Sequence, residues 1–386
     1  MVILSLGIKN ILGFEDLNLN FSYPKKLVNN TLGEEWLKDY PNFRYKKVNI
    51  FVGSNATGKS SIGKVLWGLH LFFTYKDSKY LSEYISYNSK SSEIKIEYAC
   101  NVNDQVYLNK VIIYINAAKA IFGNKYKYSI DYSYSVLGKD DTYESAVKKY
   151  NFIGHFDNYL DGLEQINHVA TWYISMPMTE SEFDIFNPNF DSLEEKKEYC
   201  TVLKKIMKVL DPTICDVQVS NEADNGYVIS FEDGKTTIIE SGDKIQDLKY
   251  LSSGSKYGPA IAMMVNSIRK NAYKFYFSDE LFSYINSEIE CAILNVMISL
   301  LGDGEQLFFT THNTDILDLQ FPLHTFYFLR RITKENGKVK LEAVCASDFE
   351  KRNNVSVKNL YDNDVFGASP NLSLLYELVS NIQGNN

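Results

Sequence analysis

The chain has 386 residues, of which 45% are hydrophobic and 23% are charged, and its formal net charge is −8. This length suits one large domain with an insertion, or two domains. The acidic balance argues against a protein coated in basic surface for nucleic acid, although a local basic groove remains compatible with it. No apolar run approaches the ~20 residues of a membrane span, and the first residues resemble a strand more than a signal peptide. The five cysteines are scattered without paired spacing, so we expect no zinc site, no disulfide framework and a reducing, cytoplasmic location.

The N-terminal part of the chain is predicted to alternate between strands and loops before it reaches a helix. Alternating apolar residues predict strands over 2–9 and 15–21. Residues 22–46 are polar and irregular, and we expect a loop there with a short helix around Glu34 to Lys38. An apolar run then predicts a buried strand over 48–52, and a helix is expected over 61–74.

A glycine-rich turn is predicted between that strand and that helix. The sequence Gly53-Ser54-Asn55-Ala56-Thr57-Gly58-Lys59-Ser60 fits the pattern G-x-x-x-x-G-K-[ST] at every fixed position. Such a loop points backbone N–H groups at phosphate oxygens, and the following helix adds partial positive charge. Lys59 can reach the β- and γ-phosphates, while the Ser60 hydroxyl can ligate Mg²⁺. The candidate nucleotide-binding residues are Gly53, Asn55, Ala56, Thr57, Gly58, Lys59, Ser60 and Ser61.

The middle of the chain is predicted to be mixed α and β. Period-two alternation over 94–98, 106–115 and 126–136 indicates an antiparallel sheet. Helices are predicted over 142–163 and 192–210, followed by two or three strands in 213–240 around Asn225-Gly226 and Asp233-Gly234 turns. Tyr126, Tyr128, Tyr132 and Tyr134 fall on one face of their strand. That face suits either contact with a partner protein or packing in the core, and the sequence leaves both open.

Two later strands end in residues that could act on a phosphate. The apolar stretch from Lys274 ends at Asp279 and Glu280. We expect Asp279 to hold Mg²⁺ and Glu280 to polarise the attacking water. The stretch 307–311 leads to His312, which is predicted to contact the γ-phosphate.

A serine-rich turn precedes the helix predicted over 260–270. Ser252, Ser253 and Gly254 lie at its start, where backbone N–H groups can bind a phosphate. In isolation this would be an ordinary capped helix start. Its place between the phosphate loop and the acidic pair favours a second phosphate-binding device.

These motifs, in this order, resemble those of the ABC-type ATPase superfamily. In chain order the four motifs read GSNATGKS, LSSGS, FYFSDE and FFTTH. Within the superfamily the chain resembles stand-alone bacterial AAA family ATPases related to the OLD proteins. The segment from Ile8 to Phe14 resembles the opening strand of those proteins. Leu360-Tyr361 and Phe366-Gly367 resemble a C-terminal element of that family. Ile285 and Asn286 stand where the family carries His and Pro. The resemblance covers about residues 1–75 and 245–370.

The resemblance implies an α/β fold: a P-loop ABC-type ATPase head with a mixed sheet and helices, carrying an α+β insertion. The expected division is 1–75 for the first half of the head, 76–245 for the insertion and 246–386 for the second half. ATP and Mg²⁺ are the implied cofactors. The implied assembly is a head-to-tail homodimer, or a higher homo-oligomer, in which the signature turn of one subunit closes over ATP held by another. The family's Q-loop glutamine has two candidates, Gln105 and Gln165.

The resemblance also suggests a biological setting. The stretch after His312 is too short for the Toprim nuclease domain of OLD proteins, so we expect a separate effector, a nuclease or toxin. Such ATPases occur in anti-phage systems such as Septu, PARIS or abortive infection. The alternative is a RecF-like DNA repair or chromosome-maintenance ATPase that binds DNA directly. Residues 76–240 contain lysines but no arginine, which disfavours a DNA-binding insertion. The long insertion disfavours a transporter subunit, and no membrane association is expected.

Overall fold

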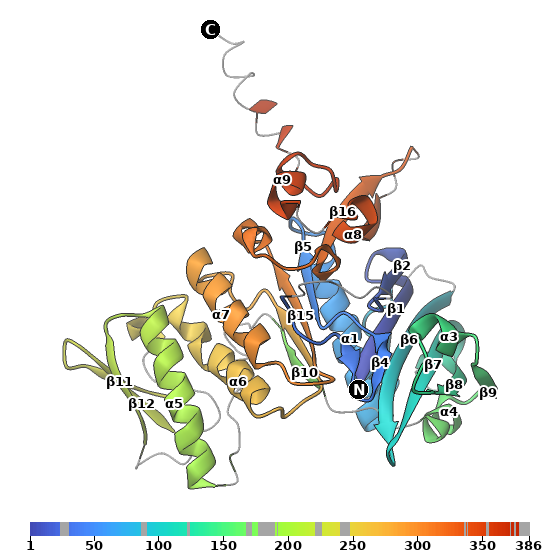
Figure 1. Cartoon of the computed structure of the whole chain (residues 1–386), viewed down its shortest axis with the longest axis horizontal. Helices are drawn as coiled ribbons and strands as arrows, with labels where there is room; N and C mark the ends of the chain where they lie inside the picture. Colours follow the sequence, from blue (N-terminus) through green and yellow to red (C-terminus); the bar gives the residue numbers. More distant parts are fainter. Residues whose placement is uncertain are drawn as a thin grey trace.

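The computed structural model describes most of the chain. The described residues are 1–23, 31–85, 91–121, 124–166, 172–176, 190, 192–220, 226–239, 248–335, 337, 339–352, 355–370, 372–373 and 376–377. Within these ranges the protein is a mixed α/β fold built on two six-stranded sheets (Figure 1). No helix in these ranges has the length and apolar character needed to cross a membrane.

The first large sheet is antiparallel and has the strand order β2-β1-β6-β7-β8-β9. Its strands are β1 (Val2–Ile11), β2 (Phe14–Asn20), β6 (Ser91–Val102), β7 (Gln105–Ile121), β8 (Asn124–Val136) and β9 (Asn151–Phe156). The turn from β6 to β7 places Asn103 and Asp104 in the left-handed region, at φ 51° and 62°. Two left-handed residues suit the twist of a two-residue hairpin, and Asn and Asp tolerate that conformation. The predicted antiparallel sheet is confirmed.

The second large sheet is mostly parallel and has the strand order β10-β14-β15-β5-β16-β17. Its strands are β10 (Trp172–Ser175), β14 (Phe275–Asp279), β15 (Gln306–Thr311), β5 (Val48–Val52), β16 (Phe326–Thr333) and β17 (Val339–Cys345). Only β17 runs antiparallel, against β16. All five residues of β5 are buried, which is why its sequence is continuously apolar except for Asn49. The carboxyl ends of β5, β14 and β15 share one edge, where ligands of such sheets bind.

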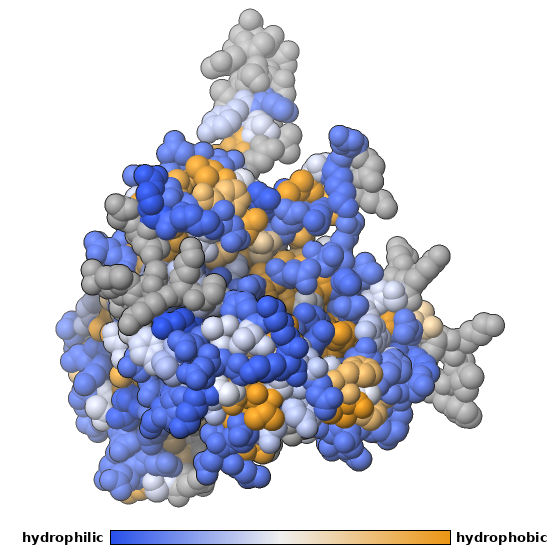
Figure 2. All heavy atoms as spheres, turned by 45° about the vertical axis from the view of Figure 1, so that its right-hand side comes forward, coloured by the Kyte–Doolittle hydropathy of each residue, from blue (hydrophilic) through white to orange (hydrophobic). Residues whose placement is uncertain are grey.

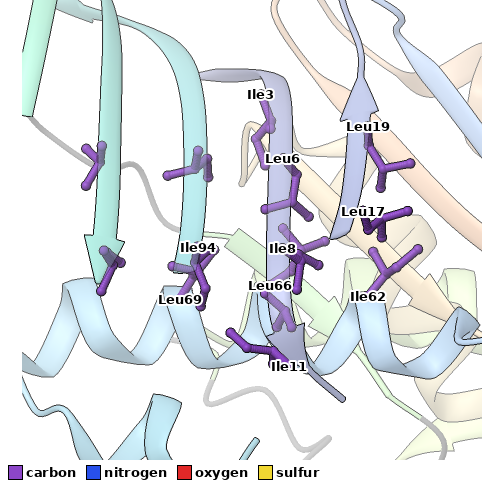
Figure 3. Close-up of a cluster of buried hydrophobic side chains, with 14 of the residues drawn as sticks. Ile3, Leu6, Ile8, Ile11, Leu17, Leu19, Ile62, Leu66, Leu69 and Ile94 are labelled. Atoms are coloured by element: carbon purple, nitrogen blue, oxygen red, sulfur yellow. The ribbon is translucent and has the colours of Figure 1, made fainter. Parts of the chain in front are cut away.

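Helix α1 (Lys59–Tyr75) lies between the two sheets. Ile62, Leu66 and Leu69 point toward the apolar side chains of β1, β2 and β6 (Figure 3). The same buried cluster includes Phe51, Phe277 and Phe308 of the parallel sheet, so α1 packs against both sheets within one core. The Gln306 side chain also joins the sheets, because its Oε1 accepts from Ile3 N at 2.7 Å and its Nε2 donates to Ile3 O at 2.9 Å.

The other face of the parallel sheet is covered by α6 (Gly258–Arg269) and α7 (Ser287–Leu300). Outside α6 lies a lobe formed by α5 (Leu193–Leu210) and a small sheet, as Figure 1 shows. That sheet contains β11 (Ile214–Val219), β12 (Tyr227–Phe231) and β13 (Thr236–Ile239), which confirms the strands predicted over 213–240. The remaining described elements of four residues or more are α2 (Lys79–Ser82), α3 (Tyr143–Val147), α4 (Tyr159–Gln165), β4 (Tyr40–Arg44), α8 (Ala346–Phe349), α9 (Val357–Asp362) and the 3₁₀ helix η4 (Thr314–Asp318).

Two predicted helices are wrong. The helix predicted over 142–163 is interrupted, because Asn151–Phe156 is extended and pairs with β8 as the edge strand β9. The helix expected around Glu34 to Lys38 is replaced by a hairpin between β3 (Trp36–Leu37) and β4. The predicted Asn225-Gly226 turn lies partly outside the described residues, because Asn225 is not among them.

The tyrosine face of β8 belongs to the protein interior. Tyr128 and Tyr132 are buried, and Tyr126 and Tyr134 pack partly buried against the same cluster. Of the two alternatives, core packing is therefore correct. The surface in Figure 2 is mainly hydrophilic, with hydrophobic residues in separate small groups. The expected division into 1–75, 76–245 and 246–386 stays a prediction; strand pairing places β6, β7, β8 and β9 in one sheet with β1 and β2.

Candidate nucleotide-binding site

The loop between β5 and α1 turns sharply through two residues with positive φ. Ala56 and Gly58 adopt left-handed conformations, at φ 60° and 101°. A side chain at Gly58 would also place its Cβ 2.6 Å from Cζ of Phe14, so only glycine fits there. The N-cap residue of α1 is Gly58, which has no side chain to cap the helix. The first N–H groups of a helix lack intrahelical acceptors, so this end of α1 offers donors and partial positive charge to an anion.

The predicted loop residues divide into exposed and buried groups. Asn55 and Ala56 are exposed at the tip, whereas Thr57 and Lys59 are buried. The Thr57 hydroxyl donates to Ser54 O at 2.8 Å, which closes the loop on itself. Ser60 and Ser61, in the first turn of α1, are half-buried. The loop is therefore held by its own side chains while its tip stays open.

The Lys59 ammonium lies across the loop. Its Nζ donates to Gly53 O at 2.7 Å and to Ser54 O at 3.0 Å, and lies 3.4 Å from Oε1 of Glu280. Burial lowers the pKa of Lys59, and the carboxylate of Glu280 opposes that shift. A cation held by carbonyl oxygens and one carboxylate can exchange these partners for phosphate oxygens.

Asp279 ends β14 and is fully buried. Its Oδ1 accepts a hydrogen bond from Thr310 Oγ1 at 2.6 Å. Its Oδ2 is buried and has no donor at ordinary hydrogen-bond geometry among the described residues. Burial raises the pKa of Asp279, and the hydroxyls of Thr310 and Ser60 oppose that shift. A carboxylate oxygen left without a donor, near a serine hydroxyl, fits the oxygen ligands that Mg²⁺ takes in proteins.

Glu280 follows in an unusual backbone conformation. Its φ is 47°, in the left-handed region that costs a residue with a long side chain about 1–3 kcal/mol. The neighbouring strand holds this conformation, since Glu280 N donates to Thr310 Oγ1 at 3.0 Å. Its Oε1 lies 2.8 Å from Nε2 of His312. The hydrogen bond from His312 lowers the pKa of Glu280 against the effect of burial, and Lys59 adds to the lowering.

His312 follows β15 and contacts both Glu280 and Lys59. Its Nε2 faces Glu280 and its Nδ1 lies 3.3 Å from Lys59 Nζ. A cavity of about 300 Å³ opens beside Glu280 and His312, and one of its lining residues is Glu290 of α7. Sequence reasoning did not single out Glu290. The available signal was its spacing from Ile293, Leu294 and Met297, which places an acid on the apolar face of a helix.

The Ser252–Gly254 turn makes its contacts away from the loop between β5 and α1. Ser252 Oγ accepts from Ser255 N at 3.1 Å, and a Cβ on Gly254 would stand 2.9 Å from Tyr284 O. Within the described residues, none of the contacts found for Ser252, Ser253 or Gly254 reaches the phosphate loop. The structure thus brings together Lys59, Asp279, Glu280 and His312, and leaves the turn apart from them.

Neither glutamine candidate lies beside these residues. Gln105 begins β7, and its Nε2 donates to Leu137 O at 3.3 Å within the antiparallel sheet. Gln165 ends α4, which packs on β8 and β9. The assignment of a Q-loop glutamine stays a prediction without support from these contacts.

No known protein family and no curated protein matches the chain. In fold it is similar to solved head domains of SMC proteins. An SMC head bound to the C-winged helix domain of ScpA has 14% identity and a TM-score of 0.45, and the match covers 91% of this chain and 100% of that one. The SMC head domain from Thermotoga maritima has 14% identity and a TM-score of 0.43, covering 89% and 99%. An SMC head with an extended coiled coil, bound to the C-terminal domain of ScpA derived from Pyrococcus furiosus, has 13% identity and a TM-score of 0.44, covering 90% and 97%. These values describe likeness of fold alone.

Proposed function

We propose that this protein is a magnesium-dependent ATPase of the ABC type. The observation that carries the proposal is the convergence of Lys59, Glu280 and His312 at the open end of a phosphate-loop-shaped turn. Lys59 comes from α1, Glu280 follows β14 and His312 follows β15, so three separate segments supply one cluster. A chance glycine-rich turn would not be accompanied by a buried lysine, a strained acid and a histidine in mutual contact.

Each residue has a distinct part in the proposed reaction. The loop N–H groups and Lys59 hold the phosphates of ATP, and Ser60 with Asp279 would hold Mg²⁺, which neutralises phosphate charge when bound. Glu280 accepts the proton of the attacking water, because its lowered pKa keeps it ionised. His312 holds that carboxylate in place. Lys59 pairs with Glu280 in this structure, so bound phosphate competes for the lysine and leaves Glu280 free to act as a base.

The test is ATP hydrolysis by two variants and two controls. Lys59→Ala removes the cation that holds the phosphates, so ATP binding falls together with turnover. Glu280→Gln removes the base, so the protein binds ATP but hydrolyses it at least about 100-fold more slowly. Lys64→Ala, on the exposed side of α1, and Glu288→Gln, exposed on α7, keep normal turnover. Near-normal turnover in both Lys59→Ala and Glu280→Gln would overturn the assignment.

We also propose that the complete site forms between two copies of the chain. The separation of the Ser252–Gly254 turn from the phosphate loop supports this, because a turn that binds phosphate would then act on a facing subunit. Mixing Lys59→Ala chains with Ser253→Arg chains tests it. In a head-to-tail dimer one site carries both changes and the other carries neither, so activity partly returns. Absence of recovery in demonstrated mixed dimers would refute composite sites.

The biological role is proposed from the sequence resemblance. We propose a switch that acts through a separate nuclease or toxin in anti-phage defence, with direct DNA binding by a RecF-like ATPase as the alternative. The insertion is proposed to bind the partner or trigger, but its tyrosine face is buried and gives no support to that role. A filter-binding assay on duplex DNA distinguishes the defence switch from the RecF-like ATPase. Tight binding with a steep salt dependence favours the RecF-like ATPase.

A further inference from the structure

Glu290 is an acidic residue in an apolar place. It lies on α7 and is 4% exposed, on the helix face that also buries Ile293, Leu294 and Met297. Burial raises its pKa, and hydrogen bonds from Thr311 and Asn313 oppose that shift. A buried carboxylate is costly unless donors satisfy its oxygens, so the identity of those donors indicates what the residue does.

Both carboxylate oxygens of Glu290 bind the segment that carries His312. Its Oε1 accepts from Thr311 Oγ1 at 2.7 Å, and its Oε2 accepts from Asn313 Nδ2 at 2.8 Å. The Asn313 amide is oriented from its other end, because its Oδ1 accepts from Asp315 N at 2.9 Å in the first turn of η4. Thr311 Oγ1 also accepts from Asn313 N at 2.9 Å. The residues before and after His312 are therefore tied to one carboxylate.

His312 itself has little packing to fix it. Its side chain is 36% exposed and borders the cavity of about 300 Å³. Its ring is oriented by contacts with Glu280 at 2.8 Å and Lys59 at 3.3 Å, and both depend on where the backbone places it. A displacement of about 1 Å in a catalytic group can cost about 100-fold in rate. The anchors on either side of His312 are thus in a position to control turnover.

We propose that Glu290 is a positioning residue of the ATPase site, which holds His312 against Glu280 by fixing Thr311 and Asn313. The inference rests on the proposed function. The competing explanation is that Glu290 only stabilises the fold. The two differ in their consequences, because a positioning residue affects kcat through His312 and leaves ATP binding by the phosphate loop unchanged.

The test compares steady-state ATP hydrolysis by single and double variants. Glu290→Leu removes both acceptors and lowers kcat about 10–100-fold, while KM for ATP changes less than about threefold. Glu290→Gln stays within about fivefold of normal, because its carbonyl oxygen still accepts from Asn313 and its amide can donate to the Thr311 hydroxyl. The double variant Glu290→Leu with His312→Ala is no slower than His312→Ala alone, since Glu290 acts through that ring.

Glu305 provides a matched control. It is fully buried and precedes β15 at the opposite end of that strand, and its carboxylate accepts from Gly302 N at 2.8 Å. Glu305→Leu therefore lowers stability as Glu290→Leu does but leaves kcat unchanged. If Glu290→Leu does not fold, Thr311→Val removes one of the two anchoring hydrogen bonds. It is expected to lower kcat about tenfold, without further loss when combined with His312→Ala.

Three results would overturn the inference. The first is a folded Glu290→Leu protein whose kcat equals that of Glu305→Leu. The second is a double variant slowed by the product of the two single effects. The third is Thr311→Val at full rate. In all three, hydrolysis that still depends on Glu280 would leave the proposed function standing. Absence of Glu280-dependent hydrolysis would instead refute the proposed function, and this inference with it.

Discussion

Gly63 sets the spacing between the phosphate loop and the acidic strand. It lies one turn after Lys59 on α1 and packs against Phe277, two residues before Asp279 on β14. A Cβ at position 63 would stand 2.5 Å from Cε1 of Phe277 and 2.9 Å from Sδ of Met176. Carbon atoms in contact prefer about 3.5–4.0 Å, so Gly63→Ala displaces the helix or the strand by about 1 Å.

The expected magnitudes follow from this contact. Overpacking costs about 1–3 kcal/mol of stability. Replacing glycine by alanine inside a helix returns about 1 kcal/mol, so the net loss is about 0–2 kcal/mol and the protein stays folded. The displacement acts between Lys59 and Asp279, so turnover is expected to fall by about 10–100-fold. The change therefore separates catalytic geometry from stability.

Gly68 on the same helix is the control. A Cβ there would stand 2.7 Å from Tyr80 O, away from the phosphate loop, so Gly68→Ala carries a similar packing cost at the far end of α1. We expect similar unfolding midpoints in urea for the two variants, and normal kcat for Gly68→Ala alone. Equal loss of kcat in both variants, or normal kcat in folded Gly63→Ala, would refute the reasoning.

Three further predictions concern the cation, the core and pH. Asp279→Asn raises the Mg²⁺ concentration for half-maximal hydrolysis at least about tenfold, because the buried Oδ2 loses its charge; an unchanged Mg²⁺ titration contradicts this. Leu66→Ala lowers the free energy of unfolding by about 2–5 kcal/mol, because the side chain is fully buried between the two sheets, whereas exposed Lys64→Ala changes it by less than about 0.5 kcal/mol. Burial raises the pKa of Glu290 in the folded chain above its ordinary value of 4.5. Between 4.5 and this raised pKa, the folded chain therefore holds a proton that the unfolded chain has released. The stability of the unmodified protein relative to Glu290→Gln therefore falls as pH rises from 4.5 to 7, and urea unfolding at both ends would show a rise or no change if this sign is wrong.

The elements around the phosphate loop could be predicted because their signals are local. The run at 48–52 is apolar at almost every position because both faces of β5 are covered, and the pattern that follows requires a turn and a helix. The acids Asp279 and Glu280 at the end of β14 and His312 after β15 could be predicted for the same reason, since they stand where apolar strands end. Parallel pairing then brings these strand ends to one edge.

The features that the sequence did not predict depend on contacts with residues far away in the chain. Asn151–Phe156 forms a strand because it pairs with the edge of β8. The residues of 142–163 carry no local signal of that pairing. The four residues of β10 pair with β14 about 100 residues later, too short a segment for periodicity to detect. The sequence places Glu290 on the apolar face of its helix, but its partners Thr311 and Asn313 lie about 20 residues later and no local pattern identifies them.

The place of β5 in its sheet has a consequence for synthesis of the protein. The two neighbours of β5 begin long after it ends, β15 about 250 residues later and β16 about 270 residues later. Ribosomes add about 5–20 residues per second, so the phosphate loop emerges roughly 10–50 s before its sheet can assemble. During that interval β5 has neither of its neighbours in the sheet, so its apolar side chains lack that cover. The proposed nucleotide binding should therefore appear late, only when β14, β15 and β16 have left the ribosome.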